Sequence, residues 1–242
     1  MRKCAVLLSG GINYSYNYKR YKNDLYLAYN VLKNIGDFSD EDIFLFYGNG
    51  TGWFEDTGII PYAAEKLQLL NRLEDLEHKL DIGDEFVLVV SNHGGNEQEG
   101  NICLWGFEYI TLLDLSKHMN KIKAKKIIIL GECFAGNILK YEITNSCIFT
   151  ANKQGEPSYA GLKEDYDEFL YHFFSYILGK YPDTKIRIPY GNNNLLEAYE
   201  YAKKQDRFSP ENERKEQIVI DGIEIMEVPQ IKNNLREISV KF

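Results

Sequence analysis

The sequence predicts an α/β fold: a mostly parallel, six-stranded sheet with helices on both faces. Two patterns in the 242-residue chain lead to this prediction. Short apolar runs rich in β-branched residues recur along it, and most of the stretches between them repeat apolar residues every three or four positions. Because this alternation is typical of βαβ units, we expect parallel strands that are covered by helices on both sides.

The expected strands are short apolar runs closed by a glycine or a small polar residue. A small hairpin is expected after the third strand, at Asn101 to Trp105. The strands are expected at Cys4 to Leu8, Ile43 to Tyr47, Phe86 to Val90, Ile127 to Leu130, Cys147 to Thr150 and Ile186 to Ile188.

Helices are expected where apolar residues, mostly leucine and phenylalanine, recur at helical spacing. The recurring positions are 25, 28 and 32; 67, 70, 73, 76 and 80; 112, 115 and 119; and 169, 173 and 177. A last helix is expected around Ala198 and Tyr199. Two polar tracts, residues 48–58 and 209–217, interrupt the pattern and predict surface loops.

The chain is expected to form a single domain over residues 1–242. Domains usually contain roughly 100 to 200 residues, and no low-complexity linker divides this sequence. Hydrophobic residues make up 44% and aromatic residues 14% of the chain, a composition that excludes disorder and coiled coils. We expect the core over about residues 3–190 and a helical, polar C-terminal extension at 191–242.

Charge and composition exclude several functions. The chain has 28 Lys and Arg against 36 Asp and Glu, a net charge of −8, and its cations are scattered, so nucleic acid is not an expected partner. Apolar runs of about five residues are far shorter than the roughly 20 that cross a bilayer, so no membrane partner is expected. The apolar run after Lys3 is too short for a signal peptide, which predicts a cytoplasmic protein.

The four cysteines form no C-x-x-C pair and no Cys/His set at zinc-ligand spacing. We therefore expect neither a metal nor a cofactor. Cys4, Cys103 and Cys147 lie inside apolar runs and are expected in the core. The SGG segment at residues 9–11 fits no nucleotide-binding motif.

Two of the expected strand ends carry reactive side chains. The third strand is followed by SNHGG (residues 91–95) and the fourth by GECFAG (residues 131–136), so that His93 and Cys133 each lie three residues beyond a strand. Ligands of open α/β sheets bind at these carboxyl ends. If the two strands are neighbours, the histidine faces the cysteine as a base that activates its thiol. Either motif alone has an ordinary structural explanation, as a buried cysteine or a turn, but the matching offsets favour a cysteine nucleophile.

These motifs resemble the caspase-like cysteine peptidases, a group that includes caspases, legumains, clostripain and gingipains. In this group a strand ending in His-Gly is followed, some forty residues later, by a strand ending in x-Cys-x-x-Gly, as at His93 and Cys133. Two further segments are similar to the legumain (asparaginyl endopeptidase) branch: NYKR at residues 17–20, and TANKQGEPSYA at residues 150–160. The resemblance covers about residues 3–180.

The resemblance implies a caspase-like sheet in which the His and Cys strands are neighbours. It implies that His93 is the catalytic base and Cys133 the nucleophile, and that the backbone N–H groups of Gly94 and Cys133 form the oxyanion hole. Asn17 and Asn92 are candidates for orienting the histidine.

The resemblance also implies a pocket for an Asn side chain, with Asp second, on the acyl side of the cleaved bond. Arg20 matches the pocket arginine of legumains, and Ser158 and Asp165 match its serine and aspartate. Glu132, which stands where legumains have alanine, is the rival carboxylate. If Arg20 pairs with Asp24 instead, an acidic pocket would select Arg or Lys, as in clostripain.

The expected function is a legumain-type cysteine endopeptidase that acts on peptide or protein substrates. A transpeptidase or ligase would use the same acyl-enzyme, and a catalytically silent protein-interaction module would keep the fold alone. A regulatory protein partner or an oligomer is left open. The loops at 48–58 and 209–217 contain Asn or Asp and are expected sites of self-cleavage.

Overall fold

A six-stranded sheet forms the centre of the computed structural model, which describes residues 1–51, 58–160, 165–212, 219–220, 223–235, 237 and 239–242. The strands lie in the order β11-β8-β7-β3-β1-β2, and all neighbours are parallel except β11, which runs antiparallel to β8. This confirms the predicted mostly parallel sheet. The strands are β1 (Lys3–Ser9), β2 (Ile43–Tyr47), β3 (Glu85–Ser91), β7 (Lys125–Leu130), β8 (Ser146–Thr150) and β11 (Gln230–Asn233).

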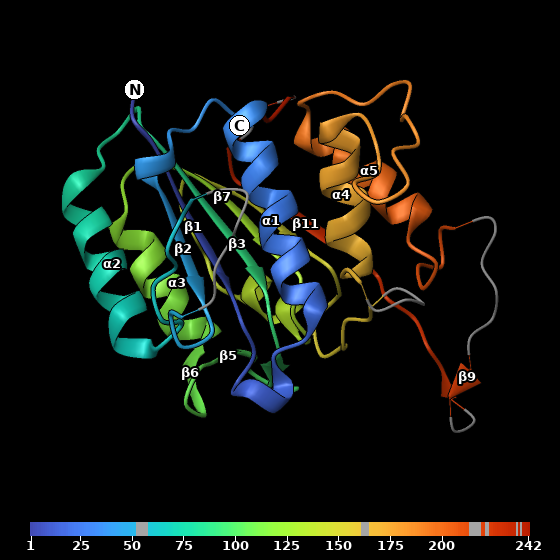
Figure 1. Cartoon of the computed structure of the whole chain (residues 1–242), viewed down its shortest axis with the longest axis horizontal. Helices are drawn as coiled ribbons and strands as arrows, with labels where there is room; N and C mark the ends of the chain where they lie inside the picture. Colours follow the sequence, from blue (N-terminus) through green and yellow to red (C-terminus); the bar gives the residue numbers. More distant parts are fainter. Residues whose placement is uncertain (52–57, 161–164, 213–218, 221–222, 236, 238) are drawn as a thin grey trace.

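Helices cover both faces of this sheet, as predicted (Figure 1). One face carries α1 (Lys19–Asn34), α4 (Glu168–Leu178) and α5 (Leu195–Gln205), and the other carries α2 (Lys66–Lys79) and α3 (Leu112–Lys121). Three short 3-10 helices complete the helical part of the described chain: η1 (Tyr14–Tyr16), η2 (Asp40–Asp42) and η3 (Ala135–Lys140).

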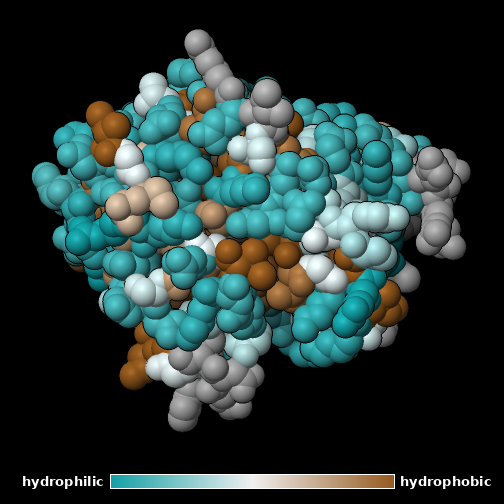
Figure 2. All heavy atoms as spheres, turned by 90° about the horizontal axis from the view of Figure 1, so that it is seen from above, coloured by the Kyte–Doolittle hydropathy of each residue, from teal (hydrophilic) through white to brown (hydrophobic). Residues whose placement is uncertain are grey.

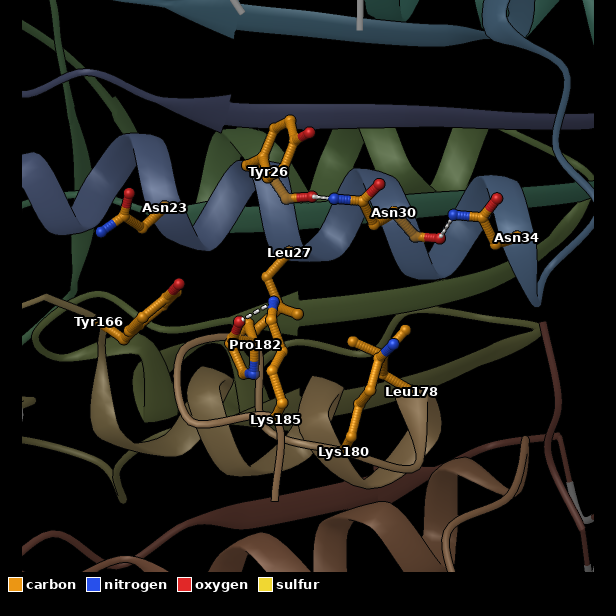
Figure 3. A pocket seen from close by; sticks show the side chains of 10 residues that line it. All are labelled: Asn23, Tyr26, Leu27, Asn30, Asn34, Tyr166, Leu178, Lys180, Pro182 and Lys185. Atoms are coloured by element: carbon orange, nitrogen blue, oxygen red, sulfur yellow. Dashed lines mark hydrogen bonds between the residues drawn. The ribbon is translucent and has the colours of Figure 1, made fainter. Parts of the chain in front are cut away.

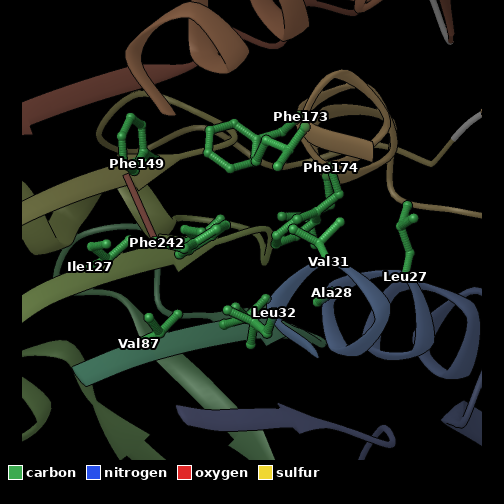
Figure 4. Packing of buried hydrophobic residues seen from close by; sticks show 14 of the residues in the cluster. Leu27, Ala28, Val31, Leu32, Val87, Ile127, Phe149, Phe173, Phe174 and Phe242 are labelled. Carbon is green, nitrogen blue, oxygen red and sulfur yellow. The ribbon is translucent and has the colours of Figure 1, made fainter. Parts of the chain in front are cut away.

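Each central strand contributes side chains to two separate cores, because successive residues of a strand point to opposite faces. In β1, Ala5 and Leu7 pack on the α1 side, whereas Val6 and Leu8 pack on the α2 side. On the α1 side, aromatic residues of β8, α4 and the C-terminus meet aliphatic residues of α1 (Figure 4). Burial on both faces explains why the strands are unbroken apolar runs rather than alternating ones.

The predicted strand at Ile186 to Ile188 is wrong, and the sixth strand is β11. Residues 180 and 187 form one isolated antiparallel bridge, and the amide of Ile188 donates to the carbonyl of Gly179, so this segment folds back on the turn after α4. The next residue, Pro189, has no N–H to donate to a sheet. The core also extends past residue 190, because β11 joins the sheet and Phe242 is buried.

A small three-stranded antiparallel sheet follows β3, which confirms the predicted hairpin. It consists of β4 (Gly94–Gly95), β5 (Asn101–Leu104) and β6 (Glu108–Thr111). Cys103, expected in the core, is half-buried on β5. Farther along, β9 (Val219–Ile220) pairs with β10 (Ile223–Glu224).

Parts of the two predicted loops, residues 52–57 and 213–217, lie outside the described residues. In the described part, no helix combines the length and the apolar composition needed to cross a bilayer. The face at which the parallel strands begin is mostly hydrophilic, with an apolar area near its middle (Figure 2).

Replacing the C-terminal residue Phe242 by Ala is expected to lower the free energy of unfolding by about 3 kcal/mol, because it leaves a cavity in the α1-side core. Urea unfolding followed by circular dichroism measures this change. Tyr190→Ala is the matched control, since Tyr190 is 84% exposed. A loss below about 0.5 kcal/mol in Phe242→Ala would show that the C-terminus does not belong to the core.

Candidate active site

His93 and Cys133 meet because β3 and β7 are parallel neighbours. Val90 lies opposite Leu130 in their register, so both strands end at the same level of the sheet. Three residues farther on, His93 and Cys133 line one cleft at the carboxyl-end rim. The sequence therefore correctly predicts that the two strands are adjacent.

The cleft is small, with a cavity volume of about 40 Å³. Its walls come from the start of α1, the ends of β3 and β7, and the segment between β8 and α4. The lining residues are Arg20, Tyr21, Ser91, Asn92, His93, Gly131, Cys133, Ser158, Tyr159, Ala160 and Asp167.

The imidazole of His93 is held by a backbone carbonyl. Its Nε2 lies 3.2 Å from the carbonyl oxygen of Tyr16, and the rings of Tyr16, Tyr18 and Tyr21 surround it at centroid distances of 5.9, 5.2 and 5.3 Å. Because a carbonyl only accepts, Nε2 carries the proton of the neutral ring and Nδ1 keeps the lone pair of a base. The sequence could not identify Tyr16 as this partner, because the contact is made by its backbone carbonyl and not by its side chain.

Asn17 and Asn92 do not hold the imidazole. The Oδ1 atom of Asn17 accepts the hydroxyl of Tyr47. The Oδ1 atom of Asn92 accepts the backbone N–H groups of Gly11 and His93, and its Nδ2 donates to the carbonyl of Cys103. Asn92 therefore shapes the turn that carries His93.

Burial keeps both reactive groups neutral at rest. It lowers the pKa of His93, and the nearby cation Arg20 lowers it further. Burial raises the pKa of Cys133, and the carboxyls of Asp167 and Glu132 raise it as well. A neutral thiol beside a neutral imidazole favours proton transfer during attack over a standing thiolate–imidazolium pair.

Ser158 fixes the thiol of Cys133 from the opposite wall. The backbone N–H of Ser158 donates to Sγ at 3.4 Å, and the thiol donates to the carbonyl of Ser158 at 3.6 Å. These two contacts hold the thiol of Cys133 against the segment between β8 and α4.

The backbones of Gly94 and Cys133 lie against each other. A Cβ atom at Gly94 would stand 1.9 Å from the carbonyl oxygen of Cys133, so only glycine fits. The carbonyl of His93 accepts from Cys103, and bonded pairs alternate in an antiparallel ladder, so the N–H of Gly94 points away from β5. The N–H of Cys133 donates to no acceptor in the described chain. Two backbone donors are thus available beside the thiol.

Arg20 and Asp167 are the two side chains of opposite charge type in the cleft lining. The guanidinium of Arg20 lies over the rings of Tyr18 and Tyr21, at 4.4 and 4.9 Å. Arg20 and Asp24 are both described and form no ion pair. Asp167 accepts the Ser158 hydroxyl at 3.1 Å through Oδ2 and caps α4 through Oδ1.

Burial raises the pKa of two neighbouring carboxyls, Asp167 in the cleft lining and Asp24 next to it. It raises the pKa of Asp167 to about 7 and that of Asp24 well above its usual range, and the charge of Asp167 adds to the effect on Asp24. The side chain of Asp24 accepts from the backbone N–H of Asp167 and from the hydroxyl of Ser91.

Asp165 and Glu132 are not among the residues that line the cleft. Asp165 forms an ion pair with Lys19 at 2.8 Å, and its carbonyl accepts from Asn23. Gly131 and Cys133 line the cleft, whereas Glu132 between them does not and is buried. Asp167, two residues after Asp165, is the carboxylate in the cleft. Its signal in the sequence is its place just before the apolar pattern of α4, where Asp is a preferred N-cap.

The carboxyl of Glu132 is fully buried behind the cleft. Neither of its oxygens has a hydrogen-bond partner among the described residues, and burial raises its pKa to about 8. The protonated form is therefore favoured at neutral pH.

The C-terminal part of the chain supports the wall that contains Ser158. The backbone N–H of Tyr159 donates to Oε2 of Glu227 at 2.5 Å, and the ring of Tyr159 packs on Phe208 at 5.1 Å. Burial raises the pKa of Glu227, and so does its neighbour Asp206, whose own pKa burial also raises. Two such carboxyls are stable together when they share a proton.

A larger hollow of about 310 Å³ lies between α1 and the turn after α4 (Figure 3). Asparagines of α1 line one side of it, and the amides of Asn30 and Asn34 donate back to α1 carbonyls. Lys180 and Lys185 line the other side. Among the residues that the structure describes, its lining includes no cysteine, histidine or carboxylate, so the small cleft is the candidate active site.

The comparisons with known proteins rest on structure alone. No family model matches the sequence, and no curated protein matches it. The fold is similar to the crystal structure of protein GSU0716 from Geobacter sulfurreducens, with a TM-score of 0.64 and 11% identity over 96% of this chain and 93% of that chain. It is also similar to the Drosophila initiator caspase Dronc, with a TM-score of 0.58 and 11% identity over 95% of this chain and 79% of that chain. The fold is thus caspase-like, as predicted.

Glu132→Gln is expected to make the stability less sensitive to a rise in pH between 4.5 and about 8. Folding raises the pKa of Glu132 from 4.5 to about 8, so the folded state holds a proton that the unfolded state releases. The contribution of this group to the free energy of unfolding therefore falls by about 1.4 kcal/mol per pH unit across that window. Urea unfolding at pH 6 and pH 8 measures the slope, with exposed Glu74→Gln as control. Equal slopes in wild type and Glu132→Gln would contradict the expectation.

Proposed function

We propose that the protein is a cysteine endopeptidase in which Cys133 is the nucleophile and His93 the general base. The observation that carries this proposal is that both residues lie at the ends of neighbouring parallel strands and line one cleft. The adjacent backbones of Gly94 and Cys133 offer two N–H groups to an oxyanion. A nucleophile, a base and oxyanion donors are the parts that acyl transfer requires.

Nδ1 of His93 takes the thiol proton as Sγ of Cys133 attacks the substrate carbonyl carbon. The C–N bond then breaks, and the imidazolium gives its proton to the leaving amine. In the second half, His93 takes a proton from water, the resulting hydroxide attacks the thioester, and the thiolate leaves and is reprotonated. The carbonyl of Tyr16 stabilises each transient imidazolium by accepting from Nε2.

We infer that the substrate carries Asn, with Asp second, on the acyl side of the cleaved bond, as in legumains. The guanidinium of Arg20 would meet the side-chain oxygen, and Asp167 would accept from the carboxamide N–H groups in the place that the sequence assigns to Asp165. A cavity of about 40 Å³ suits a short side chain. Because burial raises the pKa of Asp167 to about 7, its charge attracts a Lys or Arg side chain only weakly.

The substrates proposed are peptides or proteins in the cytoplasm. The same acyl-enzyme would serve transpeptidation if an amine replaced water. We propose that Glu132 does not bind the substrate. It stays protonated in the interior next to the cleft.

Cys133→Ala and His93→Ala are each expected to lower kcat/KM by roughly 1,000-fold or more while leaving the fold intact, because both side chains lie at a rim where truncation costs little stability. A mixed peptide library measures cleavage, and circular dichroism measures folding. Cys103→Ala is the matched thiol control, since Cys103 is half-buried on β5. Full activity of Cys133→Ala would refute the proposed peptidase.

The pocket is tested with peptides that differ only by Asn, Asp, Arg or Lys at the acyl-side position. Arg20→Ala is expected to lower kcat/KM for the Asn and Asp peptides roughly 10- to 100-fold, since hydrogen bonds to charged groups contribute about 1.5 to 3 kcal/mol. Asp167→Asn is expected to change the Asn/Asp ratio, whereas Asp165→Asn is the matched control outside the cleft. Cleavage after Arg or Lys that is undiminished in Arg20→Ala would assign the protein to the clostripain-like peptidases.

A further inference from the structure

Exposed aromatic side chains continue the cleft beyond His93. Tyr14 is 75% exposed and Tyr16 is 47% exposed, although both lie on η1 at the carboxyl-end rim of the sheet. The ring of Tyr14 stands edge-on to Trp105 at 4.9 Å. We call Tyr14, Tyr16 and Trp105 the aromatic platform. In Figure 1 the segment after β1 lies beside the β5–β6 hairpin that carries Trp105.

The platform is held in place by hydrogen bonds on several sides. The side chain of Asn13 caps η1 by accepting from the N–H groups of Ser15 and Tyr16. Asn49 donates to the hydroxyl of Tyr14 at 2.7 Å. The backbone of the hairpin is tied to the same loop, because Gly106 donates to Ile12. Exposed rings that are fixed in this way lose little conformational entropy when a ligand covers them.

His93 is linked by contacts both to the proposed specificity pocket and to the platform. Tyr18 contacts both His93 and the guanidinium of Arg20. Tyr16, a member of the platform, contacts His93 through its ring and its carbonyl. The imidazole must reach the nitrogen of the leaving amine to protonate it. The peptide that follows the cleaved bond therefore leaves the cleft on the platform side.

We propose that the aromatic platform binds an aromatic or large aliphatic side chain within the first two residues of the leaving peptide. The inference rests on the proposed peptidase function and adds a second specificity site to it. The platform has no charged side chain, and its exposed rings offer edge-to-face and stacked contacts to an incoming ring. A charged or very small side chain would make no favourable contact with these rings.

The test uses peptides that share one acyl-side sequence and differ at the first and second leaving positions, with Phe, Leu, Gly or Asp at each. We expect kcat/KM to be about 10-fold higher for Phe or Leu than for Gly or Asp at one of the two positions, because only the large apolar side chains bury surface against the rings of the platform. Tyr14→Ser is expected to reduce this preference to about 3-fold or less. Tyr190→Ser is the matched control, because Tyr190 is 84% exposed and lies outside the platform.

A second measurement uses the acyl-enzyme itself. An added amino acid amide attacks the thioester, its nitrogen forms the new C–N bond as the C–S bond breaks, and its proton returns to the thiolate through His93. We expect phenylalaninamide to divert several-fold more acyl-enzyme from hydrolysis than glycinamide does, with the difference reduced in Tyr14→Ser.

The possible outcomes distinguish failure of the platform from failure of the peptidase function. Equal kcat/KM for all leaving residues, or an unchanged preference in Tyr14→Ser, would overturn the platform while leaving the peptidase intact. Absence of cleavage of every peptide, together with failure of Cys133 to react with a thiol-directed peptidyl probe, would overturn the proposed function itself.

Discussion

The parallel pairing of β3 with β7 is the constraint on which the candidate site depends. Their register places Val90 opposite Leu130, and the two reactive residues follow at equal distances. A slip by one residue would turn every strand side chain to the other face, so two buried cores fix this register. At the rim, Gly94 lets the turn after β3 touch the backbone of Cys133. The pairing of the two strands therefore brings His93 and Cys133 to the same cleft.

Several carboxyl groups around this rim are buried away from water. Asp24, Asp167, Glu132 and Glu227 are all buried near the cleft, and burial raises the pKa of each. Arg20 is the one guanidinium among the described residues that line the cleft. The thiol thus lies near several buried carboxyls whose protonated forms are favoured by burial, rather than near a set of ion pairs. In such surroundings a charge that develops during a reaction is felt strongly by the few groups able to meet it.

The local patterns of the sequence predict most of the fold and the position of His93 and Cys133 in one cleft. Buried parallel strands and amphipathic helices have strong periodic signals, and His93 and Cys133 are marked by their offsets from two such strands. The sixth strand could not be found in this way, because β11 is short and half-buried and its place depends on pairing with β8 across some 80 residues of chain. The apolar segment at Ile186 to Ile188 resembles a strand more than β11 does. Its Ile188 is buried, but it packs as part of a turn and not in the sheet.

The pocket shows a second limit of local patterns. Asp165 and Asp167 differ by two positions, and only the start of α4 decides which one turns into the cleft. The contribution of the Tyr16 carbonyl depends on backbone geometry alone. Burial of Glu132 depends on what covers it from distant segments. Each of these features is set by tertiary packing, which residue spacing does not encode.

The contact between Tyr159 and Glu227 has a consequence for the order in which the molecule is completed. The two residues are 68 positions apart, so the carboxyl that supports the cleft wall is made well after the wall itself. At about 5 to 20 residues per second, a ribosome needs roughly 3 to 14 seconds to cover that distance. During this interval the parallel part of the sheet is already available for folding, while the N–H of Tyr159 still lacks its acceptor. The direction of synthesis thus separates the folding of the scaffold from the final assembly of the cleft.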